Sequence, residues 1–202
     1  MDKEQQFEKF LGINTSEEEV VLGHDTDMKY SAYEASEYEG LISIFDEITL
    51  TPYDTLVDYG CGMGRVLFFC NQRFMCNVTG IEYDDEIFEK LLDNVEYYNV
   101  RFKGQREKFR LLHMKAEDYV VRPEDNIFYF FNPFSMDILE GVLNRILASH
   151  KGKPRKITVI LYYCTYNMMT IMRKYPFKLE KIIKLPAYRF DPDEKVYIYT
   201  YE

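Results

Sequence analysis

Hydrophobic residues along this 202-residue chain follow two alternating periods. Short apolar runs bounded by polar residues predict strands at 55–59, 77–82, 108–113, 126–131 and 157–163. Between these runs the apolar residues recur at helical spacing, which predicts helices that start at Arg65, after Asp84 and near Leu139. The helix after Asp84 is expected to turn one apolar face to the sheet, formed by Ile87, Leu91, Leu92 and Val95. Strands that alternate with helices are typical of a mostly parallel α/β sheet.

The two ends of the chain depart from this alternation. Residues 1–30 are polar and acidic, with a short helix predicted around Lys3 to Leu11, and residues 31–50 predict a second helix that Thr51-Pro52 closes. Near the other end, 177–185 and 195–201 are both strand-like, and no convincing helical pattern separates them. Two strands joined without a helix are antiparallel, so we expect one reversed strand to be inserted late into the sheet.

Glycines are concentrated in one loop between the strand at 55–59 and the helix that starts at Arg65. Gly60, Gly62 and Gly64 follow the spacing G-x-G-x-G, and glycine lets the backbone turn sharply and approach a ligand without a Cβ atom. The start of a helix also favours polar and anionic groups. A dinucleotide-binding loop reads G-x-G-x-x-G and requires glycine where Arg65 stands. The loop therefore indicates a nucleoside cofactor other than NAD.

Further polar residues lie at predicted strand ends. Asp58 stands two residues before Gly60, Glu82 ends the second strand, and Asn132-Pro133-Phe134 follows the strand at 126–131. In an open α/β sheet, ligands bind at the carboxyl ends of the strands. A carboxylate there accepts hydrogen bonds from both hydroxyls of a ribose. These residues are expected to share one site.

This set of motifs resembles the class I S-adenosylmethionine-dependent methyltransferases. Residues 57–64 are similar to the first motif of that family, and Glu82 falls where its members place a ribose-binding acid. The resemblance implies a doubly wound, seven-stranded, Rossmann-like sheet with a C-terminal antiparallel strand pair. Residues 51–202 would form the methyltransferase core, and residues 1–50 an N-terminal helical extension or lid.

The resemblance also implies a set of cofactor contacts. Asp58 would lie near the amino-acid end of S-adenosylmethionine, Glu82 would hold the ribose, and Tyr83 would lie beside the adenine. The glycine loop would pass close to the methionine portion. After the third strand, Lys115 stands where the family often has an acid, although Ala116 fits the small position and Glu117 could supply the contact after a shift. The implied cofactor-binding residues are Asp58, Gly60, Cys61, Gly62, Gly64, Glu82, Tyr83, Ala116 and Glu117.

The triplet Asn132-Pro133-Phe134 is similar to the Asn/Asp-Pro-Pro-aromatic motif of amino-methylating members, with one proline in place of two. The resemblance implies that these three catalytic residues position an acceptor, with an amine nitrogen favoured over a nucleobase. An asparagine oxygen can accept an N–H from the acceptor, and most of the acceleration would come from alignment of nucleophile, methyl and sulfur. The alternative interpretation is a simple strand-ending turn, since asparagine and proline are common there.

Composition limits the partners. The net charge of −9 favours a small-molecule or protein acceptor over nucleic acid. Four cysteines without zinc-like spacing imply no metal and a reducing compartment. The lack of a signal core or a long apolar run predicts a cytoplasmic protein without a membrane span. A nicotinamide-dependent oxidoreductase and a non-catalytic nucleoside-binding module stay open as alternative functions.

Several single residues have simpler interpretations. Arg65 is expected to pair with a nearby acid rather than touch the cofactor or substrate, and His113 to be a hydrogen-bonded core residue. Tyr30 and Tyr33 could cover the cofactor, although generic packing is favoured. A helix face of Met168, Met169 and Met172 is typical of a core contact.

Overall fold

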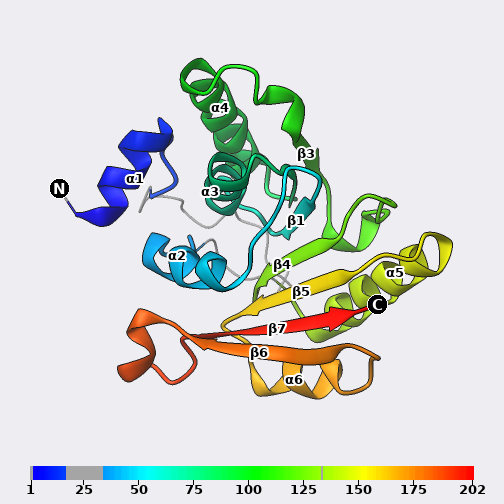
Figure 1. The fold of residues 1–202 in the computed structure, drawn as a ribbon. Coiled ribbons are helices and arrows are strands. Elements are labelled where there is room, and N and C mark those ends of the chain that lie inside the picture. Colours follow the sequence, from blue (N-terminus) through cyan, green and yellow to red (C-terminus); the bar gives the residue numbers. More distant parts are fainter. Residues whose placement is uncertain (1, 17–33, 133) are drawn as a thin grey trace.

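The computed structural model describes residues 2–16, 34–132 and 134–202 (Figure 1). Its centre is a seven-stranded sheet in the order β3-β2-β1-β4-β5-β7-β6. The strands are β1 (Thr55–Tyr59), β2 (Asn77–Glu82), β3 (Phe109–His113), β4 (Ile127–Phe131), β5 (Ile157–Tyr162), β6 (Lys178–Lys184) and β7 (Lys195–Tyr201). The first five strands pair in parallel, and β7 is antiparallel to both β5 and β6. This confirms the predicted mostly parallel sheet with its reversed late strand.

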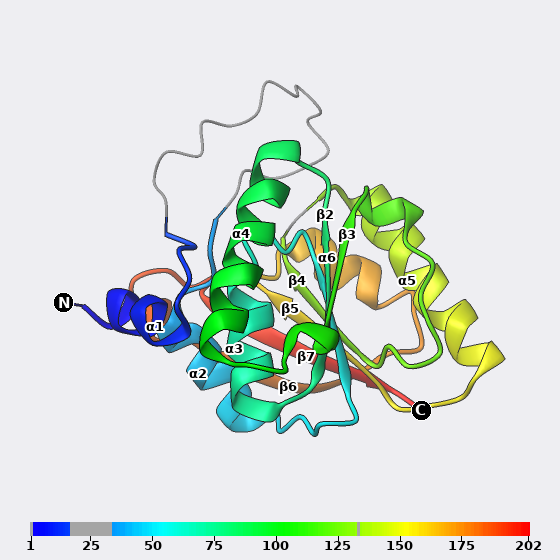
Figure 2. The ribbon, with the colours of Figure 1, turned by 90° about the horizontal axis from the view of Figure 1, so that it is seen from above.

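Helices cover both faces of the sheet. They are α1 (Lys3–Leu11), α2 (Tyr38–Glu47), α3 (Arg65–Phe74), α4 (Asp85–Arg101), α5 (Met136–Gly152) and α6 (Tyr166–Met172). Figure 2 shows α3 and α4 on one side of the sheet, together with α1 and α2, and α5 and α6 on the other. Two apolar clusters of buried residues, one under each helical layer, form the core. Neighbouring strand residues such as Leu56 and Val57 belong to different clusters, because side chains alternate across a strand.

The order of the strands creates the point where a ligand can bind. The chain runs outward from β1 through β2 to β3, then returns to place β4 on the other side of β1. In open α/β sheets, ligands bind at the carboxyl ends of the strands at such a switch point, which here lies between β1 and β4. The loops that carry Gly60 and Asn132 leave this edge.

Two details of the helices differ from the sequence prediction. The helix predicted at 31–50 begins at Tyr38 and ends at Glu47, and residues 34–37 are not helical. The side chain of Glu4 accepts the backbone N–H of Tyr38 at 2.9 Å, so a contact from α1 marks the start of α2. On α4, Leu91 is buried but Leu92 is 38% exposed, because consecutive helical residues point in directions about 100° apart.

Gly80 in β2 makes room for the glycine loop. It pairs in register with Asp58 on β1. A Cβ atom at position 80 would lie 2.6 Å from Leu67 Cδ1 and 2.7 Å from Cys61 Sγ. Both neighbouring side chains are buried, so neither can move away freely. The missing side chain in β2 therefore lets Cys61 pack against the sheet.

We expect the substitution Gly80→Ala to lower the free energy of unfolding by about 1–3 kcal/mol, since overpacking forces buried side chains to shift. Chemical denaturation would measure the change. Gly152→Ala is the matched control, because a Cβ atom at Gly152 meets nothing within 4 Å. Equal stabilities of the two variants would contradict the packing argument.

Candidate active site

The loop between β1 and α3 folds back onto β2. Gly60, Gly62 and Gly64 have φ angles of 74°, 53° and 92°, in the left-handed region that favours glycine. The backbone N–H groups of Gly60 and Cys61 both donate to the carbonyl oxygen of Ile81, at 2.9 and 3.0 Å. The loop therefore keeps its backbone close to the carboxyl end of β2. It then enters α3 directly after Gly64.

Glu82 holds this loop from the side of β2. Its side chain is 7% exposed. One carboxylate oxygen accepts the backbone N–H of Gly62 at 3.0 Å, and the other accepts those of Tyr83 and Asp84 at 2.8 and 3.0 Å. Burial raises the pKa of Glu82, and the three amide donors counteract that rise. The residue predicted to hold a ribose thus also joins the loop after β1 to the turn after β2.

Asp58 is the second buried acid of the site. Its side chain is 3% exposed. Burial raises the pKa of the Asp58 carboxyl to about 8, and the negative charge of Glu82 adds to this effect. A cation placed beside Asp58 would restore its ionised form. The α-ammonium group of a bound amino acid moiety has this charge, which fits the position predicted for Asp58.

The residues predicted near the adenine follow two neighbouring strands. Tyr83 comes directly after β2, while Ala116 and Glu117 lie in the short 3-10 helix η2 (Ala116–Asp118) after β3. The ends of these strands are adjacent, since Glu82 and His113 pair in register. Ala116 is buried, and the other two side chains are half-buried. The structure brings the three residues to one edge of the sheet, and their contact with adenine stays a prediction.

The residues predicted to position the acceptor lie after β4. Asn132 is half-buried and has a φ angle of 39°, a left-handed backbone that few non-glycine residues adopt. Pro133 lies outside the described residues. Phe134 is 5% exposed, and its ring packs edge-on against Tyr59 and Phe130, with centroids 6.3 and 6.0 Å apart. Phe134 therefore supports this edge from within the core, and its contact with the acceptor stays a prediction.

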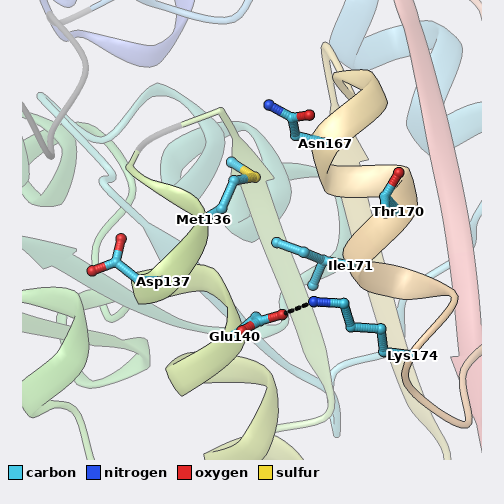
Figure 3. Close-up of a pocket in the computed structure, with 7 residues that line it drawn as sticks. All are labelled: Met136, Asp137, Glu140, Asn167, Thr170, Ile171 and Lys174. Atoms are coloured by element: carbon cyan, nitrogen blue, oxygen red, sulfur yellow. Dashed lines mark hydrogen bonds and ion pairs between the residues drawn. The ribbon is translucent and has the colours of Figure 1, made fainter.

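A groove that the sequence did not indicate lies between α5 and α6 (Figure 3). It has a volume of about 340 Å³ and is lined by Met136, Asp137, Glu140, Asn167, Thr170, Ile171 and Lys174. The ammonium group of Lys174 pairs with Glu140 at 2.6 Å across it. None of the predicted cofactor residues lines this groove. The periodicity of each helix was visible in the sequence, but the gap depends on how the two helices pack.

Two single-residue predictions are now decided. Arg65 pairs with the acids Glu4 and Glu8, as expected. His113 is hydrogen-bonded through Nε2 to the carbonyl of Tyr83, but its side chain is 41% exposed, so its assignment to the core was wrong. The reason is that β3 is an edge strand of the sheet. Tyr30 and Tyr33 lie outside the described residues.

Across the described ranges 2–16, 34–132 and 134–202, no group of three or more His, Cys, Asp or Glu side chains is arranged to hold a metal ion. All four cysteines are free and buried. In the same ranges, no helix has both the length and the apolar character needed to cross a membrane.

Comparison with known protein families shows which family this chain belongs to. A family model described as "Histone methylation protein DOT1" matches residues 18–125, which is more than half of the chain. The chain belongs to the DOT1 family. This match covers β1, the glycine loop and Glu82. No curated protein sequence matches this DOT1-family chain.

Several solved structures similar to this DOT1-family chain are named as methyltransferases. An RNA methyltransferase from Salinibacter ruber, in complex with S-adenosyl-L-homocysteine, has a TM-score of 0.57 at 13% identity, over 83% of this chain and 93% of that chain. A precorrin-6y C5,15-methyltransferase from Geobacter metallireducens has a TM-score of 0.59 at 14% identity, over 90% and 96%. At these identities the likeness establishes the fold, which confirms the predicted methyltransferase architecture.

The family match and the fold together make this chain an S-adenosylmethionine-dependent methyltransferase. The alternatives of a nicotinamide-dependent oxidoreductase and a non-catalytic nucleoside-binding module are set aside by the same findings. The buried acids fit the cofactor: Asp58 suits the ammonium group of its methionine portion, and Glu82 is an acceptor at the edge where a ribose would lie. When bound, S-adenosylmethionine supplies an electrophilic methyl group on a sulfonium.

We expect Glu82→Gln to weaken the binding of S-adenosylhomocysteine by about 10- to 100-fold, because the amide nitrogen cannot accept the backbone N–H groups that the carboxylate accepts. Calorimetric titration measures the affinity. Glu89→Gln, an exposed position on α4, is the control and should bind like the wild type. Equal affinities of both variants would exclude Glu82 from the cofactor site.

We expect Asp58→Asn to stabilise the ligand-free protein progressively as pH rises. The folded-state pKa of about 8 lies above the ordinary value of 3.8, so the wild type loses stability between about pH 4 and pH 8, whereas asparagine does not ionise. The gain in free energy of unfolding should grow by on the order of 3 kcal/mol from pH 5 to pH 8. Denaturant titrations at both pH values measure it, and parallel pH profiles would contradict the assigned pKa.

Proposed function

We propose that this methyltransferase transfers the methyl group of S-adenosylmethionine to an amine nitrogen on a protein. The observation that carries this proposal is the position of Asn132. It follows β4 directly, in a left-handed conformation, and β4 pairs with β1 so that Tyr59 lies opposite Phe130. The asparagine and the glycine loop therefore leave the sheet at the same edge, on neighbouring strands.

The chemistry of amine methylation suits the residues at this edge. A neutral amine must aim its lone pair at the methyl carbon, opposite the sulfur. The side-chain oxygen of Asn132 can accept one N–H of the amine and thereby fix its orientation. No strong base is needed at the nitrogen, because its proton can leave after attack. The acceleration then comes mainly from alignment and from exclusion of competing orientations.

Two observations support a protein as the acceptor. The net charge of −9 favours association with basic partners, and lysine is such a residue: its ammonium group carries the charge that associates, and after it releases one proton to solvent it is the neutral amine that can be methylated. The description of the matching family model, histone methylation, agrees with a protein acceptor, although that match ends at residue 125 and so does not include Asn132. The solved neighbours do not select an acceptor, because their names refer to RNA, geranyl diphosphate and a precorrin.

The test is methyl transfer from S-adenosylmethionine with a labelled methyl group to three separate acceptors: core histones as basic proteins, transfer RNA, and spermidine. We expect label in the histones, recovered as methyl-lysine after acid hydrolysis. Label in RNA or spermidine alone would contradict a protein acceptor, and label lost on mild base treatment would indicate an ester rather than an amine.

We expect Asn132→Ala to lower kcat by about 100-fold, since loss of a positioning hydrogen bond misaligns the amine. Its affinity for S-adenosylhomocysteine should stay close to that of the wild type, because the proposed contact is with the acceptor. Asn144→Ala, an exposed position on α5, is the matched control. Full activity of Asn132→Ala would exclude the proposed role.

A further inference from the structure

Arg65 is a buried, positively charged residue at the start of a helix, where a positive charge is unfavourable. It is the first residue of α3, directly after Gly64, and is 5% exposed. The N-terminus of a helix carries partial positive charge, which repels a cation. Burial of an unpaired charge is also strongly unfavourable. Arg65 is therefore stable here only if other parts of the chain supply compensating partners.

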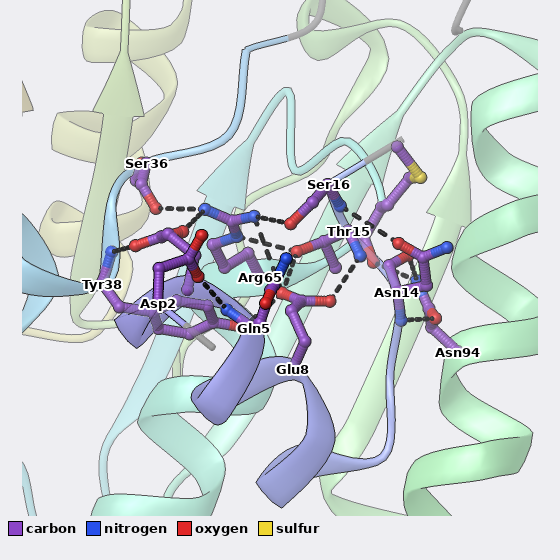
Figure 4. Close-up of polar contacts among 12 residues, drawn as sticks. Asp2, Gln5, Glu8, Asn14, Thr15, Ser16, Ser36, Tyr38, Arg65 and Asn94 are labelled. Carbon is purple, nitrogen blue, oxygen red and sulfur yellow. Dashed lines mark hydrogen bonds and ion pairs between the residues drawn. The ribbon is translucent and has the colours of Figure 1, made fainter. Parts of the chain in front are cut away.

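Those partners come from the N-terminal extension (Figure 4). The guanidinium donates from Nη1 to the carboxylate of Glu4 at 2.6 Å and from Nε to the hydroxyl of Thr15 at 2.7 Å. It also donates from Nη2 to the hydroxyl of Ser16 at 2.8 Å and from Nη1 to the carbonyl of Ser36 at 3.2 Å. These contacts join α1 and two later points of the extension to one side chain beside the glycine loop.

Glu8 completes the network around the guanidinium. Its carboxylate lies 3.6 Å from Arg65 Nη2 and accepts the hydroxyls of Tyr38 and Thr15, both at 2.6 Å. It also accepts the backbone N–H of Thr15 at 2.7 Å. The ring of Tyr38 lies against the guanidinium, 4.7 Å from centroid to Cζ. Residues that precede the α/β core thus compensate the charge of the Arg65 guanidinium and also pack against its planar face.

A second contact ties the same segment to the loop. Asn94 on α4 accepts the backbone N–H of Asn14 at 2.8 Å and donates to the carbonyl of Asn14 at 2.9 Å. The same amide nitrogen donates to the carbonyl of Met63 at 3.1 Å. Met63 precedes Gly64 in the glycine loop. Residues 14–16 are therefore joined to Met63 through Asn94 and to Arg65 directly, and these two positions flank Gly64.

We propose that Arg65 is a positioning residue for cofactor binding. Through Arg65, the N-terminal extension holds the glycine loop in the shape that accepts S-adenosylmethionine. Three glycines leave that loop with little intrinsic preference for one conformation. Glu82 fixes it from the side of β2, and the Arg65 network fixes it from the side of the extension. A loop ordered before binding loses less entropy when the cofactor arrives.

The test compares Arg65→Met with Arg73→Met, both in the full chain. Arg73 stands in the last turn of the same helix and pairs with Asp46 on α2 at 2.6 Å, far along α3 from the loop. Affinity for S-adenosylhomocysteine is measured calorimetrically at a temperature where each variant is fully folded. We expect Arg65→Met to bind about 10- to 100-fold more weakly, and Arg73→Met to bind like the wild type even where its thermal stability falls.

Further variants keep the proposal testable should Arg65→Met fail to fold. Ser16→Ala removes one acceptor of the guanidinium, and Arg65→Lys keeps the charge but cannot reach several acceptors at once. Both should weaken S-adenosylhomocysteine binding by a smaller factor than Arg65→Met. Wild-type affinity in all three, or an equal loss in Arg73→Met, would overturn the proposal and assign Arg65 to packing alone. Neither result would bear on the acceptor.

Discussion

The candidate site depends on the hydrogen bonds that the carboxylate of Glu82 accepts from the backbone. By accepting backbone N–H groups from Gly62, Tyr83 and Asp84, one side chain fixes the loop after β1 and the turn after β2 relative to each other. Hydrogen bonds to an ionised acceptor are stronger than neutral ones, and burial makes their loss costly. The glycine loop is therefore held by the same group that is predicted to bind the ribose of the cofactor.

The other side of the loop depends on ion pairing between distant segments. Arg65 would be doubly unfavourable alone, as a buried charge and as a cation at a helix N-terminus. Glu4 and Glu8 compensate it, so ion pairs link α1 to the first residue of α3, beside the glycine loop. Asp58, in contrast, has a carboxyl whose pKa is raised to about 8 by burial. The ligand-free protein thus satisfies the buried charge of Arg65 internally, and it leaves Asp58 as a buried carboxyl that a cationic ligand would ionise.

Much of the fold followed from periodicity. The strands β1 and β2 have the predicted bounds, and the late antiparallel pair was indicated by two β-like runs without a helix between them. Two of the errors concern contacts between elements. The start of α2 is set by Glu4, and His113 is exposed because β3 is at the sheet edge. The local sequence pattern predicts neither the start of α2 nor the exposure of His113, because each depends on the elements that lie beside that segment.

The sequence by itself determined the fold class, the glycine loop and the strand-end acids, because these depend on local spacing and on the fixed geometry of parallel strands. Only the tertiary structure decided that Glu82 bonds the loop and that Gly80 makes room for Cys61. It also decided that residues 15 and 16 bond Arg65 and that Asn94 links Asn14 to Met63. Such contacts join residues far apart in the chain, so their distances are set by packing rather than by sequence separation. The groove between α5 and α6 arises for the same reason.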